Sequence, residues 1–464
     1  MKVEVLKPSF KVKESGLEFS PEVLAAIFAR YSRNGEGITD ILKGLEKTPV
    51  DKFQDAVWKW LDYGHASIGG LTGGIPTGVD RVSMLIPYLG FFLQPKQDGQ
   101  ETSTRYVEFK PEGLEKPSEF GIPERFHQEW YRVMLEGFAI NKDLTAKLDE
   151  LGKNNPELAK IPSTANDKVR TRMIKNFGFD RSRYTLPVAG LTNFGMVMTA
   201  REWTQTIQYL DSFDIKSSRD LAGMLREGIT EVAPKLMKHS FGTDRTRSFA
   251  DDFLDRGVQY LLRNGVNTSQ AQDEVIVEVH NPVRSGYIHP ELTDEQLMDL
   301  SFKGKQNRYD FAKGLAEKTF VSILWNNMAI AEARDINRQR PCKKDTLLAP
   351  IGSYMPDISV EEMKKGDGKL YQRYQRFLDD RAKLMTSILN SENPRAYTGC
   401  LLLGDQTPFE LHTTGDHLAY VTELRTGIGV HFRYEDHMRR VHKQLTEKRP
   451  DLAKHIVLGK GEPE

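Results

Sequence analysis

The sequence predicts a mixed α/β (α+β) fold that contains one unit twice, with a small sheet covered by long helices. Three observations predict it. Short segments near the start of each copy alternate Val with polar residues, long stretches have the apolar spacing of helices, and pairs of segments recur in the same order along the chain. A small sheet covered by long helices is an α/β or α+β arrangement.

The first recurring segment is a short strand. Residues 3–8 read Val-Glu-Val-Leu-Lys-Pro, and residues 277–282 read Val-Glu-Val-His-Asn-Pro. Alternation of Val with a polar residue is typical of a half-buried strand, and the proline ends it. An acidic helix start follows in each copy, at 20–22 and at 293–296, and the second has the Thr-x-x-Gln form of a capping box.

The second recurring pair lies at the far end of each copy. Leu-Thr-Asn-Phe at 191–194 corresponds to Gln-Thr-Pro-Phe at 406–409, and Pro-x-Leu-x-Lys-His occurs at both 234–239 and 450–455. We interpret each Thr-x-Phe segment as part of a helix, because helical spacing follows it. A shared order of matches favours duplication, whereas each short match alone arises easily by chance.

The repeat predicts two domains, 1–268 as a first copy and 269–464 as a divergent second copy, with the boundary in a polar stretch near residue 270. Because a doubled chain behaves as a covalent dimer, each copy can keep different functional groups around one composite site. Predicted strands lie mostly near the starts of the copies. The predicted helices are 22–32, 51–62, 123–152, 201–213, 217–238, 249–263, 294–304, 307–334, 360–391, 416–426 and 434–447.

Composition excludes several classes of function. The 464 residues suffice for two cores, and Lys+Arg and Asp+Glu balance at 65 each, so a general nucleic-acid binder is not expected. Two cysteines without a Cys-x-x-Cys pair predict neither a disulfide framework nor a metal site. The apolar stretch 82–93 is too short to cross a membrane, and the N-terminus has no secretion signal. We expect a soluble, cytoplasmic protein.

Two segments of the first copy are candidate binding loops. Gly-His-Ala-Ser at 64–67 follows a predicted helix, so His65 and Ser67 can hold a ring or a phosphate; the alternative is an ordinary helix end. Glu101, Ser103 and Arg105 alternate, and on an extended backbone they share one face that suits a phosphate and a sugar hydroxyl. The alternative there is a solvated strand edge.

Other candidate residues are arginines. Arg183 precedes Leu-Pro and opens a loop, although a lone Arg is more often a surface charge. Arg338 and Arg340 flank Gln339 at the end of a predicted long helix and could present two guanidinium groups to a pyrophosphate, or merely complement the helix dipole. Arg425 ends a helix of the second copy. Without a nucleophile motif or a metal site, an enzyme would need a cofactor.

Together these segments resemble the flavin-dependent thymidylate synthases. That family has a Gly-His-x-Ser/Thr loop, an Arg-His-Arg followed by Ser-x-Arg-Tyr, and an Arg-x-x-Leu-Pro segment before a long helix that ends in Arg. The first copy matches at 64–67, 101–106 and 183–187 but has Leu210 at the helix end and lacks Arg-His-Arg. The second copy has Arg-Gln-Arg at 338–340 and Arg425 but lacks Ser-x-Arg-Tyr.

The resemblance implies FAD as cofactor and dUMP, methylenetetrahydrofolate and NADPH as ligands, in a homodimer of the doubled chain. It also implies roles for the candidate residues: nucleotide binding by Glu101, Ser103, Arg105 and Arg183, flavin binding by His65, Ser67, Arg338, Gln339 and Arg340, and stabilisation of charge on the pyrimidine by Arg425. The alternatives are a related flavin reaction on another pyrimidine nucleotide and a non-catalytic nucleotide-binding paralogue.

Overall fold

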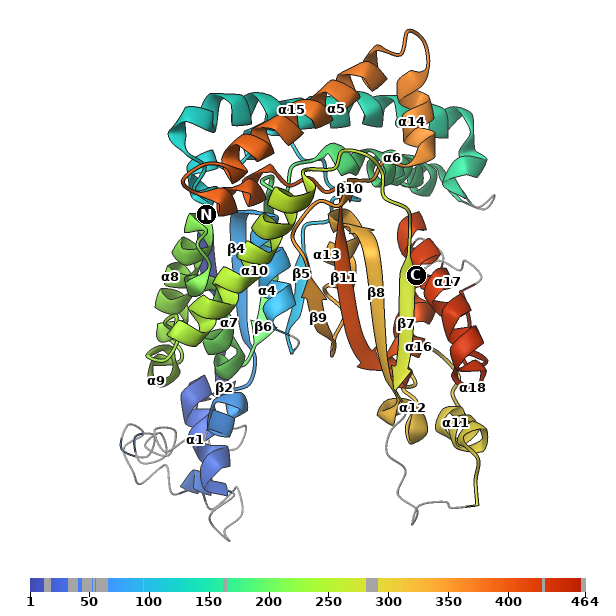
Figure 1. Cartoon of the computed structure of the whole chain (residues 1–464). Coiled ribbons are helices and arrows are strands. Elements are labelled where there is room, and N and C mark those ends of the chain that lie inside the picture. Colours follow the sequence, from blue (N-terminus) through green and yellow to red (C-terminus); the bar gives the residue numbers. More distant parts are fainter. Residues whose placement is uncertain are drawn as a thin grey trace. The chain divides into compact units, whose positions relative to one another are not determined.

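The computed structural model describes residues 1–11, 18–31, 41–43, 52, 55, 66–94, 96–161, 165–280, 291–427 and 430–459 (Figure 1). The chain forms two compact units, each built from three separate segments. Unit 1 comprises Met1–Phe138, Pro187–Val258 and Ser387–Cys400, and unit 2 comprises Ala139–Leu186, Gln259–Thr386 and Leu401–Glu464. These units are discontinuous, whereas the domains predicted above are continuous. The duplication, with its boundary near residue 270, stays a prediction. The predicted α+β class is confirmed.

Unit 1 contains an antiparallel four-stranded sheet. Its strand order is β1 (Lys2–Val5), β4 (Ile75–Ser83), β6 (Leu191–Met198) and β5 (Asp98–Glu101). Trp203 on a packed helix is fully buried and donates a hydrogen bond from its indole to the carbonyl of Ile75 at 2.9 Å. A short hairpin pairs β2 (Phe10–Lys11) with β3 (Glu18–Phe19). The α-helices whose bounds are described in this unit are α1 (Pro21–Tyr31), α4 (Leu85–Leu93), α7 (Ala200–Ser212), α8 (Lys216–Thr230) and α9 (Pro234–Met237).

Unit 2 contains the second antiparallel sheet. Its order runs from β7 (Val275–His280) through β8 (Phe320–Ala329) to β11 (Asp405–Thr414), which also pairs with β9 (Lys343–Thr346) and β10 (Gly352–Ser353). Figure 1 shows these strands side by side, with α16 and α17 packed beside them. The α-helices of this unit are α6 (Asp167–Ser182), α11 (Asp294–Phe302), α12 (Leu315–Lys318), α13 (Ile330–Ile336), α14 (Asp357–Lys364), α16 (Gly415–Arg425), α17 (Phe432–Lys448) and α18 (Pro450–Ala453).

Three longer helices contain a unit boundary within their length: α5 (His127–Asn154), α10 (Asp244–Asn264) and α15 (Lys369–Leu389). The 3-10 helices are η1 (Ala66–Leu71), η2 (Pro111–Gly113), η3 (Pro117–Phe120), η4 (Glu124–Phe126), η5 (Pro156–Ala159), η6 (Arg183–Thr185) and η7 (Pro394–Cys400). Among the helices of the described ranges, none is both long and apolar enough to span a bilayer.

The two sheets share one strand order, apart from the additional strand β10 in unit 2. In unit 1, β4 lies between β1 and β6, and β5 flanks β6; in unit 2, β8 lies between β7 and β11, and β9 flanks β11. Strands β4 and β8 each continue into a helix, α4 or α13. Strands β6 and β11 continue into α7 or α16, with Thr199 or Thr414 as the N-cap residue. The next helices, α8 and α9, correspond in order to α17 and α18, which agrees with the repeated Pro-x-Leu-x-Lys-His segments.

Strand registers give a residue-by-residue correspondence between the sheets. Phe194 on β6 pairs with Val79 and Glu101 on its two neighbours. Phe409 on β11, which the sequence repeat equates with Phe194, pairs with Trp325 and Thr346. Val79 therefore corresponds to Trp325, and Glu101 corresponds to Thr346.

Two predictions about secondary structure are wrong. The predicted helix 307–334 is mostly replaced by strand β8 and the short helix α13. Val321, Ile323 and Trp325 are buried and alternate with partly exposed residues, so the segment has a period of two. Both Thr-x-Phe segments are strands, β6 and β11, rather than helices, because their alternate side chains likewise enter a sheet face.

Several helix boundaries follow local signals. The predicted capping box is confirmed: Thr293 accepts from the backbone of Gln296, whose side chain accepts in return from the backbone of Thr293. The predicted helix 360–391 is interrupted between α14 and α15, where Gly366 and Gly368 have φ of 76° and 68°. Such left-handed positions favour glycine. The predicted helix 51–62 lies almost wholly outside the described residues.

A buried ion pair joins α15 to the start of β11 in unit 2. Arg381 Nη1 donates to both carboxylate oxygens of Asp405, at 2.7 and 2.6 Å, and neither side chain is exposed. Asp405 also accepts from the backbone N–H of Leu402 at 2.8 Å. The carboxylate therefore fixes the turn that precedes β11.

The segment Ser387–Cys400 is held in unit 1 by polar contacts as well as by packing. Trp130 on α5 donates from its indole to the carbonyl of Gly399 at 2.9 Å. Arg395 pairs with Asp251 and Asp255 on α10. This late part of the chain thus completes a unit that begins at the N-terminus.

Candidate functional site

The predicted residue Arg183 lies in a tightly packed turn of unit 2. It begins η6 directly after α6, and only 2% of its surface is exposed. The backbone N–H of Gly404 donates to the carbonyl of Tyr184 at 2.9 Å. A Cβ at position 404 would lie 2.6 Å from that carbonyl oxygen, so glycine is needed for this approach. The turn is therefore anchored to the segment before β11.

Arg183 faces a buried carboxyl group on α13. Its Nη2 lies 3.9 Å from Glu332 Oε1, and the same oxygen accepts a 2.6 Å hydrogen bond from the hydroxyl of Tyr184. Glu332 is fully buried. Its other oxygen, Oε2, has no hydrogen-bond partner among the described residues. Glu332 is not among the predicted site residues because it lies within the predicted helix 307–334.

The pKa of Glu332 reflects burial against two cations. Burial raises this pKa above its ordinary value, although the guanidinium groups of Arg433 and Arg183 act in the opposite direction. Burial and the neighbouring carboxyl group also raise the pKa of Tyr184 well above its usual value, so its hydroxyl stays protonated and donates to Glu332. A change in the ionisation of the Tyr184 hydroxyl would therefore cost substantial free energy.

Two of the predicted arginines meet at Tyr434 of α17. Arg183 Nη2 donates to the Tyr434 hydroxyl at 3.3 Å, and the guanidinium carbon of Arg425 lies 5.9 Å from the Tyr434 ring centroid. We call Arg183, Tyr184, Glu332, Arg425 and Tyr434 the Tyr434 cluster. Its members come from η6, α13, α16 and α17.

Arg425 differs from Arg183 in its pairing. It is half-buried at the last position of α16, and within the described ranges it has no hydrogen bond or ion pair. Arg308 approaches the same helix end, because a Cβ at Gly427 would lie 3.6 Å from its Nη1. A cation without a carboxylate partner here is available to an anionic ligand, while the helix C-terminus offsets part of its charge.

Replacement of Arg425 is expected to separate binding from stability. Because Arg425 has no hydrogen bond or ion pair among the described residues and contacts the Tyr434 ring, Arg425→Ala should change the free energy of unfolding by less than about 1 kcal/mol. The comparison is Arg433→Ala, which should cost at least about 2 kcal/mol because it removes both hydrogen bonds from Arg433 to Asp273 and leaves Asp273 only the longer ion pair with Arg440 among the described residues. Urea denaturation measures both. A large loss in Arg425→Ala would show that this side chain is structural.

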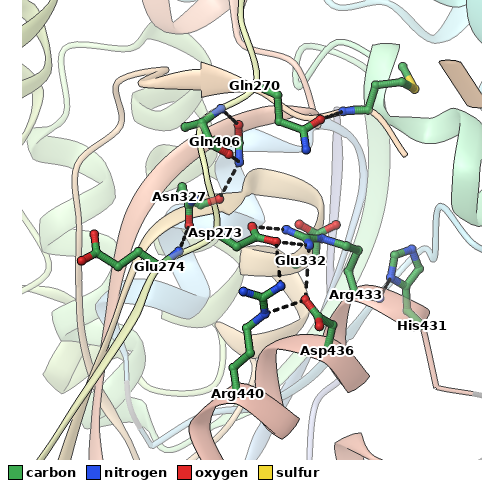
Figure 2. A network of polar contacts seen from close by, with 12 residues as sticks. Gln270, Asp273, Glu274, Asn327, Glu332, Gln406, His431, Arg433, Asp436 and Arg440 are labelled. Atoms are coloured by element: carbon green, nitrogen blue, oxygen red, sulfur yellow. Dashed lines mark hydrogen bonds and ion pairs between the residues drawn. The ribbon is translucent and has the colours of Figure 1, made fainter. Parts of the chain in front are cut away.

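Arg433 lies in a network of charges beside the cluster (Figure 2). Its two Nη atoms donate to the two oxygens of Asp273 at 2.6 and 2.7 Å, and its guanidinium carbon lies 4.2 Å from the Tyr354 ring centroid. Although burial opposes ionisation, hydrogen bonds from Arg433 hold the pKa of Asp273 below its usual value. Arg440 and Asp436 extend this network along α17.

His431 orients the start of α17. Its Nδ1 accepts from the backbone N–H of Arg433 at 3.2 Å, so Nε2 carries the proton and donates to the carbonyl of Asp180 at 3.1 Å. The tautomer is therefore set by two backbone groups. His431 thus links the end of α6, which leads to Arg183, with the helix that carries Tyr434.

The predicted Arg-Gln-Arg segment follows the seven-residue helix α13 rather than a long helix. Arg338 forms an ion pair with Asp335 one turn earlier, and Arg340 Nη1 lies 3.5 Å from the carbonyl of Arg338. Gln339 is buried. The charge of Asp335 also acts on Arg183, so this segment adjoins the Tyr434 cluster.

A lysine adds to the positive charge after α13. Lys344 on β9 donates from Nζ to the carbonyl of Asn337. Burial lowers the pKa of Lys344 to about 8, with a smaller contribution from Arg340 in the same direction. Cys342 and His417 lie nearby, with Sγ and Nδ1 3.5 Å apart.

The predicted residues Glu101, Ser103 and Arg105 lie in unit 1, but the expected extended backbone is wrong. Strand β5 ends at Glu101, and the chain then turns. Ser103 closes the turn: its hydroxyl accepts from the N–H of Arg105 at 3.2 Å, and its carbonyl accepts from Tyr106 and Val107. A serine side chain that competes for backbone donors favours such turns. The three side chains are partly exposed.

The remaining predicted loop is described only in part. His65 lies outside the described residues, and Ser67 belongs to η1, of which only the backbone is described at that position. Gly70 in the same helix approaches Arg201, since a Cβ there would lie 3.3 Å from its guanidinium.

The described ranges contain no group of three or more His, Cys, Asp or Glu side chains that could hold a metal ion. A scan against protein-family models and a search of curated proteins gave no match for this chain.

Proposed function

We propose that this chain is a flavin-dependent enzyme of thymidylate-synthase type, which transfers a methyl group to C5 of dUMP with methylenetetrahydrofolate and NADPH. The proposal treats the chain as two diverged copies of one unit. It assigns the required groups to the chain as a whole, since neither copy has all of them. The observation that carries it is the correspondence of strands β5 and β9.

These two strands correspond by register, because Glu101 and Thr346 pair with the equivalent residues Phe194 and Phe409. The segment Glu101-x-Ser103-x-Arg105 begins at the last residue of β5, and Arg338-x-Arg340 comes before β9. If β5 and β9 were superimposed in this register, the arginines would precede the shared strand and the Glu-x-Ser-x-Arg segment would follow from its end. That is the order of the signature in the flavin-dependent thymidylate synthases, so each copy supports the proposal by keeping one part.

The side chains present suit an anionic ligand. Arg340, Lys344 and Arg425 supply positive charge near the end of α13 or at the end of α16, and guanidinium groups bind phosphate oxygens well. We propose that Arg338, Gln339 and Arg340 hold the flavin and that Glu101, Ser103 and Arg105 bind the nucleotide. A bound flavin would supply the hydride, so no protein nucleophile is needed.

The role proposed for Arg425 rests on its charge and on the absence of a carboxylate partner among the described residues. In a site that excludes water, a fixed cation stabilises negative charge that develops on a pyrimidine ring. Tyr434 limits the movement of the guanidinium by contact with its face. We propose Arg425 as the group that stabilises the transition state.

A non-catalytic nucleotide-binding paralogue is the second candidate function. One observation weighs against the catalytic proposal: Arg183, which the resemblance assigns to nucleotide binding, is buried beside Glu332 and hydrogen-bonded to Tyr434. If that pairing persists with nucleotide present, Arg183 cannot contribute as proposed. A related flavin reaction on another pyrimidine nucleotide is the remaining alternative.

Absorbance and product analysis distinguish these functions. We expect the purified full-length chain, mixed with FAD, to keep a flavin spectrum after desalting and to lose it when NADPH is added. Incubation with dUMP and methylenetetrahydrofolate should then yield dTMP. A flavoprotein that makes no dTMP would support the related reaction. A protein that binds dUMP but no flavin would support the non-catalytic role.

Arg105 provides a residue-level prediction. Arg105→Ala should weaken dUMP binding by roughly 1.5–3 kcal/mol, which is about 10–150-fold in the dissociation constant, because a charged hydrogen bond to phosphate is lost. Lys110→Ala removes an exposed cation five residues later and serves as the matched control. Isothermal titration calorimetry measures both. Equal affinities for Arg105→Ala and the unchanged protein would remove Arg105 from the site.

A further inference from the structure

Two buried aromatic rings of unit 2 carry nitrogen atoms that have no hydrogen bond to any described residue. Trp325 extends from β8 and His437 from α17, and both side chains are fully buried. Their ring centroids are 6.4 Å apart, with the planes at 76°. Neither belongs to the Tyr434 cluster.

The unpaired atoms are Nε1 of Trp325 and both ring nitrogens of His437, none of which has a hydrogen-bond partner among the described residues. A neutral imidazole offers one donor and one acceptor, and the indole offers one donor. Buried polar groups are almost always bonded to protein or to an internal water, since an unpaired one costs free energy. A small polar partner, such as an internal water, would satisfy these nitrogens.

The corresponding positions of unit 1 are apolar. Val79 corresponds to Trp325 by strand register, and Leu221 corresponds to His437 because each is the sixth residue of its helix, α8 or α17. Both are fully buried. The architecture can thus be filled by two aliphatic side chains, and the polar pair is specific to unit 2.

Charged neighbours act on His437. Arg433 and Arg440 lie on the same helix, and Asp273, before β7, pairs with both. Burial and the two arginines oppose protonation of the imidazole, while Asp273 favours it. A neutral imidazole keeps one lone pair that can accept a hydrogen bond.

We propose that unit 2 contains an internal water-binding site between His437 and Trp325. The water accepts the indole N–H and donates to the unprotonated nitrogen of the imidazole. With hydrogen bonds of about 2.8 Å on each side, one water can bridge two nitrogens that are up to roughly 5.6 Å apart. A direct hydrogen bond cannot span that distance.

Magnetic relaxation dispersion of water oxygen-17 counts long-lived internal waters and tests the site. The variant Trp325→Val/His437→Leu introduces the residues of unit 1, and it should have one fewer such water than the unchanged protein. An equal count would overturn the proposal. The control is Trp203→Phe, which removes an indole already bonded to Ile75 and should leave the count unchanged.

A high-resolution crystal structure of the unchanged chain tests the site even if that variant does not fold. We expect an ordered water within about 3.2 Å of both Trp325 Nε1 and a nitrogen of His437. A direct hydrogen bond between the two rings, with no water between them, would contradict the proposal.

Discussion

Asp405→Ala should destabilise unit 2 by about 3–5 kcal/mol, because it leaves the buried guanidinium of Arg381 without its carboxylate. Both side chains have no exposed surface, and Arg381 Nη1 donates to both oxygens of Asp405. The substitution also removes the acceptor for the backbone N–H of Leu402. Urea denaturation, followed by far-ultraviolet circular dichroism, measures the loss.

An exposed ion pair of the same helix provides the control. Arg373 on α15 pairs with Asp143, and the two side chains are 33% and 51% exposed. Asp143→Ala should therefore cost at most about 1 kcal/mol. The double variant Asp405→Leu/Arg381→Met should recover much of the loss, since it removes both buried charges. Similar losses for Asp405→Ala and Asp143→Ala would refute the importance of burial here.

Stability should fall on acidification because of His437. Burial lowers the pKa of His437 to about 3, with Arg433 as the next cause, whereas an unfolded histidine titrates near 6.5. Between these values the unfolded chain binds a proton that the folded chain does not. Stability contributed by the neutral ring is therefore complete above about pH 6.5 and is lost as the pH falls towards 3. From pH 7.5 to 5.0 the loss is about 2 kcal/mol.

Unfolding midpoints at pH 7.5 and 5.0 test this expectation. His437→Leu should show a smaller fall in stability than the unchanged protein, by about that amount. His280→Gln replaces an exposed histidine of the same unit and should not alter the pH dependence. If His437→Leu and the unchanged protein lose the same stability between pH 7.5 and 5.0, the His437 ring does not cause the pH dependence.

The sequence predicts those elements whose signals are local. The Thr293 capping box and the helix near 434–447 depend on neighbouring residues, and both occur. The prediction for the residues of strand β8 is wrong because its apolar run passes directly into α13, so helical and strand spacing are mixed in one stretch. Strands β6 and β11 are predicted as helices for a similar reason, since each is followed at once by a helix.

The candidate site could be predicted only through individual arginines. Arg183 and Arg425 were identified, and in the structure both contact Tyr434. Glu332 and His437 were missed, because a sequence does not show that a charged or titratable side chain is buried by residues distant in the chain. Such burial depends on tertiary packing, whereas the spacing of apolar residues depends on the local helix or strand.

The late segment of unit 1 has a consequence for the synthesis of the protein. The last of the three segments supplies Gly399, which accepts from Trp130, and Arg395, which pairs with Asp251 and Asp255. About 130 residues separate that segment from the preceding one. At roughly 5–20 residues per second, a ribosome needs on the order of 6–26 s to bridge this interval. During those seconds the nascent N-terminal unit has surfaces that its own chain cannot yet cover.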